Sequence, residues 1–176
     1  MRGAERRDAE FTEFVRVRTP GLFRSAMLLT TDRPGAEDLV QSTWVKAYVG
    51  WARVCSAADP VAYLHGILIK TFQSQLRRRS AQERPLDPEI STRLADGSVE
   101  PDPALRLALL TALRELSPLD RAVVVLRHWE DRSVEQTAAQ LGLSEAAVKN
   151  RSLRSLRTLR DLLADHLTPA DDGSIR

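Results

Sequence analysis

A short stretch near the C-terminal end, TAAQLGLSEAAVKNRSLRSLR (Thr137–Arg157), carries side chains that can read the edges of base pairs. At 100° per residue, four of them share one side of a helix and two flank it: Asn150, Leu153, Arg154 and Arg157, with Lys149 and Arg151. Asparagine can pair bidentately with adenine, arginine can do so with guanine, and leucine can contact the thymine methyl group. The other side carries Val148, Ser152, Ser155, Leu159 and Leu162. The stretch predicts a helix that enters the major groove of DNA.

The elements before this helix are predicted to hold it in place. Ser133 with Gln136 three residues later indicates a capping-box start for one helix. Gly142 follows the last periodic residue of that helix, where a left-handed C-cap is easiest for glycine. Ser144 then caps the next helix, and the small Ala138 permits a close crossing. Together these signals predict a helix-turn-helix unit; the alternative is a solvated arginine face on an ordinary helical hairpin.

Apolar residues recur at helical spacing along nearly the whole chain, and alternating β-branched runs are scarce, so we predict an all-α protein. The apolar share of 43% in 176 residues is enough for compact cores. Helices are expected over five segments before the helix-turn-helix: Glu10–Leu29, Gly35–Trp51, Val61–Arg79, Ala104–Leu116 and Leu119–Asp131.

A break in composition divides these helices into two groups. Residues 80–103 contain several prolines and an excess of acidic residues without sustained periodicity, which is typical of a flexible linker. We therefore predict two small helical domains, residues 1–79 and 104–168, joined by this acidic linker and followed by a disordered tail at 169–176. The net charge is only +2, so the placement of charges matters more than their sum.

The composition argues against several other classes of protein. The longest apolar stretches fall well short of the roughly 20 residues that span a bilayer, and no apolar segment follows the charged N-terminus, so we predict a cytoplasmic protein without membrane contact. Cys55 is the only cysteine, and it and the histidines lack metal-ligand spacing, so neither a metal nor a cofactor is expected. An enzyme that uses Cys55 or a histidine is poorly supported, because no nucleophile–base set or phosphate-binding glycine loop is readable.

Two runs of sequence indicate a known family. AEDLVQSTWVKAY (Ala36–Tyr48), followed by PVAYLHGILIKTFQSQLRRRS (Pro60–Ser80), resembles domain 2 of bacterial RNA polymerase sigma factors of the extracytoplasmic-function type. LRELSPLDRAVVVLRHWEDRSVEQTAAQLGLSEAAVKNRSLRSLRTLR resembles their domain 4. The two runs occur in the family's order with no domain 3 between them, so the resemblance extends from Phe11 to Leu163. It implies a non-enzymatic subunit that joins core RNA polymerase, recognises the −35 and −10 elements and promotes promoter melting.

The resemblance implies a surface for core polymerase. In the family, the helix that resembles Ala36–Tyr48 docks on the clamp helices of the largest polymerase subunit. The matching positions here are Asp38 and Gln41, with Val45 on the same face. A carboxylate and an amide on one exposed face suit a partner surface that carries arginine. The alternative is a solvated acidic pair near a helix N-terminus.

A second implied surface binds the melted −10 strand. The loop Arg53–Asp59 matches the family's specificity loop, which captures a flipped base, and the next helix lines the path of the strand. The candidate residues are Trp51, Arg53, Lys70, Gln73, Arg77, Arg78 and Arg79. We interpret Trp51 chiefly as core, with stacking on DNA as the second interpretation. Lys70 and Ser74 depart from the Asn and Asp common at these positions, so melting is predicted rather than a particular −10 sequence.

By the same resemblance, the −35 duplex is read by Lys149, Asn150, Leu153 and Arg154, while Arg151 and Arg157 hold phosphates. The acidic linker would thread toward polymerase channels that bind nucleic acid, either as a mimic or as a plain solvated linker. The implied partners are core RNA polymerase, promoter DNA as duplex and as melted strand, and an anti-sigma factor as a further candidate.

The alternative function is a free-standing helix-turn-helix regulator that binds operators without polymerase. It gives no role to the Asp38 helix or to the arginine-tipped Val61–Arg79 helix, and it predicts tight duplex binding by the isolated protein.

Overall fold

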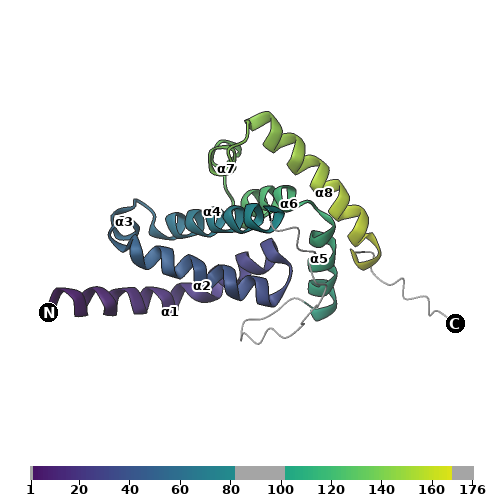
Figure 1. Ribbon diagram of the computed structural model, residues 1–176. Coiled ribbons are helices and arrows are strands. Elements are labelled where there is room, and N and C mark those ends of the chain that lie inside the picture. The colour runs from purple at the N-terminus through teal and green to yellow at the C-terminus, as the bar shows by residue number, and fades with distance from the viewer. Residues whose placement is uncertain (1, 82–101, 168–176) are drawn as a thin grey trace.

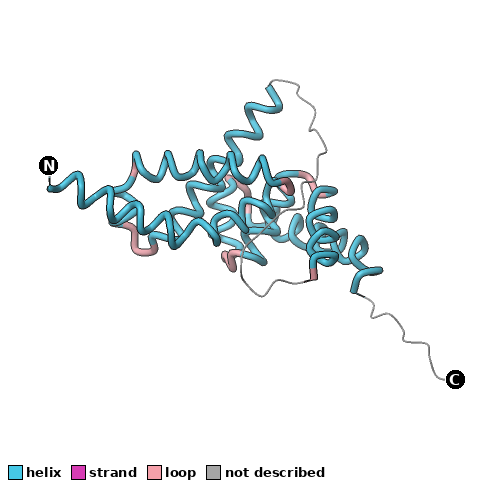
Figure 2. Tube along the Cα trace, turned by 90° about the horizontal axis from the view of Figure 1, so that it is seen from below, coloured by secondary structure: helices cyan, strands magenta, loops and turns pink. Residues whose placement is uncertain are grey.

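The computed structural model describes residues 2–81 and 102–167, and every regular element within these ranges is a helix (Figure 1). The same residues in Figure 2 contain helices and loops but no strand, which confirms the all-α prediction. The elements are α1 (Arg2–Thr30), α2 (Arg33–Val49), α3 (Trp51–Ser56), α4 (Pro60–Ala81), α5 (Pro103–Glu115), α6 (Pro118–Val124), the π-helix η1 (Val125–Trp129), α7 (Val134–Leu141) and α8 (Glu145–Leu167). Most of the predicted linker and the predicted tail at 169–176 lie outside the described residues.

Several helices begin and end where local sequence signals place them. Oδ1 of Asp32 accepts a hydrogen bond from the backbone N–H of Gly35 at 2.7 Å and caps α2. Ser133 and Gln136 form the predicted capping box of α7, with reciprocal bonds of 2.9 and 3.0 Å. Gly142 ends α7 with a φ of 68°, the left-handed conformation expected of a glycine C-cap. The last two signals fix the start and the end of α7, and Gly142 begins the turn to α8.

The first helix is longer than predicted, because α1 begins at Arg2 rather than Glu10. Its added turns contact the end of α2 through Tyr48. The Tyr48 hydroxyl donates a hydrogen bond to Oδ1 of Asp8 at 2.9 Å, and the Arg7 guanidinium donates to the Tyr48 carbonyl at 2.8 Å. This tertiary support for the N-terminal turns is not visible in the periodicity of α1 itself.

The predicted loop Arg53–Asp59 is shorter in the structure than in the prediction, because α3 extends as far as Ser56. Val54 of α3 is fully buried, and its backbone N–H donates to the carbonyl of Gly50 at 3.2 Å. Burial of one side chain per turn is enough to hold such a short helix against the rest of the module. The loop that remains between α3 and α4 is Ala57–Asp59.

Residues 2–81 form the first of two modules. Helices α1, α2 and α4 lie side by side and form its core (Figure 1). Each contributes a fully buried leucine, namely Leu22, Leu39 and Leu68. At the far end of this core, the Phe11 ring meets Trp44 and Trp51 edge-on, with centroids 5.9 and 5.2 Å apart.

The second module comprises residues 102–167. In it, α6 packs against the helix-turn-helix formed by α7 and α8. Val123 of α6 and Val148 of α8 are fully buried, and they share a core with Leu141 of α7. On the other side, α5 covers the later part of α8 through Leu113 and Leu159. Helix α8 is therefore held between α6, α7 and α5.

The two modules contact each other, with α1 against α6 and η1, and α4 against α7 (Figure 1). Arg121 of α6 is buried at this junction. Its Nη1 donates to the carbonyl of Leu29 at the end of α1 at 2.8 Å, and its Nε and Nη2 donate to the carbonyls of Leu113 and Leu116 at 2.9 and 3.2 Å. One guanidinium thus serves the carboxyl ends of α1 and α5, where helix dipoles favour a cation. Burial lowers the pKa of Arg121 to about 10, so the side chain stays charged at neutral pH.

Glu130, which follows η1, makes a second polar contact between the modules. Its Oε2 lies 2.7 Å from Nδ1 of His65 in α4, and its Oε1 accepts a hydrogen bond from the Ser25 hydroxyl of α1. Burial alone raises the pKa of Glu130, but the contacts with His65 and Ser25 outweigh it and bring the pKa below the ordinary value of 4.5. The stabilisation is therefore fully present above pH 4.5 and is lost as the pH falls through the lowered pKa.

We expect Glu130→Gln to lower the free energy of unfolding by about 1.5 kcal/mol at pH 7, because it removes a carboxylate from two largely buried contacts. Urea titrations at pH 7 and pH 3 measure the change, with the exposed Glu135→Gln of α7 as the control. The difference from wild type should narrow at pH 3, because this pH lies below the ordinary pKa of 4.5, where the Glu130 carboxylate of the unfolded chain protonates. An equal difference at both pH values would contradict the assignment of the low pKa to Glu130.

Candidate nucleic-acid and partner interfaces

The exposed and buried sides of α8 separate largely as the sequence predicts. The candidate base-reading and flanking residues Lys149, Asn150, Leu153, Arg154 and Arg157 are exposed, and Arg151 is half-buried. On the other side, Val148, Ser155 and Leu159 are buried. Leu162 was expected on the buried side but is 46% exposed. It lies beyond Leu159, close to the C-terminal end of α8.

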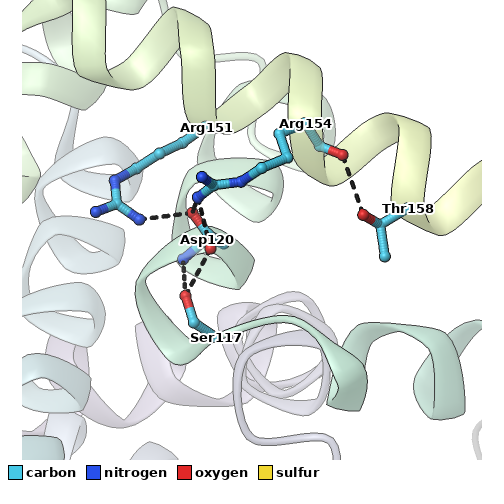
Figure 3. Close-up of polar contacts among 5 residues, drawn as sticks. All are labelled: Ser117, Asp120, Arg151, Arg154 and Thr158. Atoms are coloured by element: carbon cyan, nitrogen blue, oxygen red, sulfur yellow. Dashed lines mark hydrogen bonds and ion pairs between the residues drawn. The ribbon is translucent and has the colours of Figure 1, made fainter.

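Two arginines of α8 converge on one carboxylate of α6 (Figure 3). Nη1 of Arg151 donates to Oδ1 of Asp120 at 2.7 Å. Nη2 of Arg154 donates to both oxygens of the same group, at 3.2 and 3.3 Å. The hydroxyl of Ser117, the N-cap residue of α6, donates to Oδ2 at 2.7 Å. Asp120 is thus a shared partner of Arg151, a candidate flanking residue, and Arg154, a candidate base-reading residue.

The charge on Asp120 is stabilised by these contacts. Its side chain is only 12% exposed, and burial by itself raises its pKa. The hydrogen bonds from Ser117 and Arg151, together with the charges of Arg151 and Arg154, outweigh burial and lower the pKa below the ordinary value. Asp120 is therefore ionised at neutral pH.

Sequence reasoning missed this role of Asp120. The spacing Ser117-Pro-Leu-Asp120 is the signature of a helix start, and the sequence placed Asp120 only in a first turn. The partner arginines lie 31 and 34 residues later. Arg151 and Arg154 are three residues apart and share one side of α8, but this spacing does not identify their partner on α6.

The predicted polymerase-binding residues lie together on an exposed part of α2. Asp38 and Gln41 are exposed, and Val45 is 65% exposed. Oδ2 of Asp38 accepts a hydrogen bond from Nε2 of Gln75 in α4 at 2.9 Å. The carboxylate is therefore oriented by a neighbouring helix and still open to solvent. Val49, one turn beyond Val45, is 80% exposed and extends the apolar part of this face.

The candidate −10 residues are divided between accessible and covered positions. Lys70, Arg77 and Arg78 are exposed on α4, and Arg53 is exposed on α3. The Arg79 side chain lies outside the described part of the chain. Nε2 of Gln73 lies 3.5 Å from the carbonyl of Leu141, the last residue of α7, so this position faces the second module.

For Trp51 the structure decides between the two interpretations of the sequence, core packing and stacking on DNA. It is 6% exposed, and its ring packs against Phe11 and Phe14 with centroids 5.2 Å apart in each pair. A ring enclosed in an aromatic cluster presents no face on which a base can stack. Trp51 therefore belongs to the core of the first module, as in the chief interpretation of the sequence.

The described residues also bear on metal, thiol and membrane sites. Within residues 2–81 and 102–167 no group of three potential metal ligands comes together. Cys55 is exposed on α3 as a free thiol. None of the helices in the described ranges is both long and apolar enough to cross a membrane.

Comparison with protein families and known proteins agrees with this arrangement. Residues 14–82 match the family model described as sigma-70 region 2, and residues 106–159 match sigma-70, region 4. The chain is 40% identical over 154 residues to the RNA polymerase sigma-E factor of Streptomyces avermitilis, which covers 88% of this chain and 85% of that protein. It is 38% identical over 154 residues to the factor of the same name from Streptomyces coelicolor, covering 88% of this chain and 86% of that protein.

Two solved structures have a similar fold. The sigma factor RpoE, solved with the anti-sigma factor NepR from Bartonella quintana, gives a TM-score of 0.70 at 26% identity, over 88% of this chain and 97% of that one. CnrH, solved with the cytosolic domain of CnrY, gives a TM-score of 0.56 at 25% identity, over 90% of each chain.

Proposed function

The chain belongs to the sigma-70 family of RNA polymerase sigma factors, as a member of its extracytoplasmic-function type, and from this membership we propose which of its surfaces carry out initiation. It is an RNA polymerase sigma factor, and the free-standing regulator is not favoured, because region 2 is present together with region 4. Residues 1–79 serve as the domain for core polymerase and the −10 element. Residues 104–168 serve as the domain for the −35 element, with 80–103 as the linker and 169–176 as the tail.

Core polymerase binds through α2 in this proposal. Asp38 supplies a charge that Gln75 orients at 2.9 Å, and Gln41 and Val45 continue the same exposed face. A carboxylate beside exposed valines suits the clamp helices of the largest polymerase subunit, where arginine can pair with Asp38 and apolar side chains can cover Val45.

The melted −10 strand follows α4 and the loop after α3. Lys70, Arg77 and Arg78 are exposed cations on α4 and can neutralise successive phosphates, while Arg53 lies near the loop that would take a flipped base. Gln73 and Arg79 complete this set from the sequence. Trp51 is left out, because it is buried.

The −35 element is read by α8. The observation that carries this proposal is the exposed face of asparagine and arginine on α8, which follows the capped helix α7 and the turn at Gly142. Asn150, Leu153 and Arg154 are assigned to base edges, together with Lys149, and Arg151 and Arg157 to phosphates. Positioning by phosphates and readout by bases then come from adjacent turns of one helix.

Three further assignments follow from family membership. Sigma factors are generally non-enzymatic initiation factors, and we propose that this chain likewise leaves catalysis to the polymerase and needs no cofactor. Its place of action is the cytoplasm, where the polymerase works. An anti-sigma factor is a proposed partner, supported by two similar structures: RpoE was solved with an anti-sigma factor, and CnrH with the cytosolic domain of CnrY.

Run-off transcription on a fragmented genomic library tests the function directly. Core polymerase with the full chain should give discrete start sites, and neither component alone should give them. Sequence-specific duplex binding by the chain alone, without any polymerase-dependent start site, would overturn the function in favour of a free-standing regulator.

We expect Arg154→Ala to weaken holoenzyme binding to a natural −35 element about 10-fold, because one bidentate contact to a base is worth about 1–3 kcal/mol. Arg160→Ala is the matched control, since it removes an exposed arginine from the same helix, six residues beyond Arg154 toward its C-terminal end. Equal losses in the two variants would show that only the charge of α8 matters. The measurement is holoenzyme affinity for one promoter with its natural and with a scrambled −35 element.

A further inference from the structure

We propose that Asp120 is a positioning residue for promoter recognition: it holds Arg151 and Arg154 in the orientation in which α8 reads the −35 element. The inference rests on the proposed function of α8 and adds a residue outside the helix-turn-helix to its specificity. It is carried by the convergence of both arginines on one carboxylate (Figure 3).

Asp120 has the rigidity that such a role requires. It lies in the first turn of α6, its side chain is 12% exposed, and its neighbours Arg121, Ala122 and Val123 are all buried. The Ser117 hydroxyl donates to Oδ2 of Asp120 at 2.7 Å, while the Asp120 backbone N–H donates back to that hydroxyl at 3.2 Å. The carboxylate is thus fixed from its own side before either arginine contacts it.

Arg154 is held by one nitrogen and is otherwise free. Only Nη2 contacts Asp120, and among the described residues neither Nε nor Nη1 of Arg154 has a partner. The guanidinium carries five N–H groups, and the second N–H of Nη2 shares an edge with Nη1 or with Nε, so a two-nitrogen edge is still available for the O6 and N7 atoms of guanine. The side chain remains 67% exposed while its direction is set.

The same exposure argues against an inhibitory lock. An ion pair with a largely exposed arginine contributes little to stability in water, so it cannot compete with DNA for the guanidinium. The ion pair can, however, restrict the rotamers of the Arg154 side chain before DNA binds. Less side-chain entropy is then lost on binding. Arg151 is 31% exposed and bonds Oδ1 of Asp120 at 2.7 Å, so it is the more firmly held of the two.

Asp120→Asn in the full chain, assembled with core polymerase, tests the proposal. The readout is the ratio of holoenzyme affinities for one promoter with its natural and with a scrambled −35 element. We expect this ratio to fall about 5-fold, since the amide keeps the shape but loses the charge that holds both arginines. Asp161→Asn removes the same charge from an exposed site on α8 and should leave the ratio unchanged.

A double-mutant cycle separates positioning from a structural role. If Asp120 acts through Arg154, then Asp120→Asn causes little further loss of the ratio in an Arg154→Ala background. A merely structural effect would lower the thermal midpoint and reduce the ratio equally in both backgrounds, and this would overturn the proposal. So would an unchanged ratio in Asp120→Asn while wild type discriminates between the promoters. A wild-type holoenzyme without any discrimination would instead refute the proposed function of α8.

Discussion

Asp38→Arg is expected to lower the affinity of this sigma factor for core polymerase by at least about 100-fold, because it replaces an attractive charge with a repulsive one at the centre of the proposed interface. Like charges placed face to face across an interface cost several kcal/mol, and about 2.7 kcal/mol is already a factor of 100. The hydrogen bond from Gln75 is lost as well. Competition between the variant and labelled wild type for core polymerase measures the effect.

Glu37→Arg is the matched control for this prediction. Glu37 is the neighbouring residue on α2 and is also exposed, but its carboxylate pairs with Arg33 of the same helix at 2.6 Å. One residue along a helix turns the side chain by about 100°, so the same change of charge points away from the Asp38 face. If both variants compete equally well, Asp38 has no special place in the interface, and the assignment of this face is wrong.

Arg121→Met is expected to destabilise the protein by about 4 kcal/mol, a large share of the stability of an ordinary domain. The substitution removes a donor from the carbonyls of Leu29, Leu113 and Leu116. The Leu113 carbonyl keeps the backbone N–H of Leu116 at 3.2 Å, whereas the other two lose the guanidinium, and each buried carbonyl left without a donor costs about 1–3 kcal/mol. Arg121→Lys should recover only part of the lost stability, because a compact ammonium group lacks the planar fork of the guanidinium and cannot reach all three carbonyls. Chemical denaturation measures the free energy of unfolding.

Arg24→Met provides the comparison for Arg121→Met. Arg24 is exposed on α1, so its replacement should change the free energy of unfolding by no more than about 0.5 kcal/mol. A similar small change for Arg121→Met would mean that water replaces the guanidinium easily, and that the junction between the modules contributes little to stability.

Local signals in the sequence were sufficient for the helix-turn-helix. The capping box at Ser133 and Gln136, and the left-handed Gly142, depend on neighbours within four residues, and all are found in the structure. Helical periodicity alone predicts the exposed face of α8. On the opposite side, Leu162 is exposed although the periodicity places it with the buried residues.

Contacts between distant residues could not be predicted in the same way. Arg121 and Leu29 are 92 residues apart, and Ser25 and Glu130 are 105 apart. A composition that indicates a linker leaves the arrangement of the two modules open, so neither contact has a sequence signature. The same holds for Asp120, whose local pattern indicates a helix cap and conceals its second role.

The interpretation of Trp51 shows a different limit. A large aromatic residue near a loop is compatible with core packing and with base stacking, and only the positions of Phe11 and Phe14 decide between them. The family resemblance carried Trp51 into the −10 set, whereas its burial removes it. The Val54 side chain explains the related error, since its burial converts most of the predicted specificity loop into α3.

The junction between the modules has a thermodynamic consequence for every ligand of this protein. A ligand that binds the modules apart must first separate Arg121 from the end of α1 and Glu130 from His65. Its apparent dissociation constant then equals the intrinsic one divided by the fraction of open molecules, so an open fraction of about 1% weakens binding about 100-fold. A ligand that prefers the joined form has no such penalty. The combined strength of the contacts across this junction thus sets a common scale for the affinities of partners that bind the modules apart.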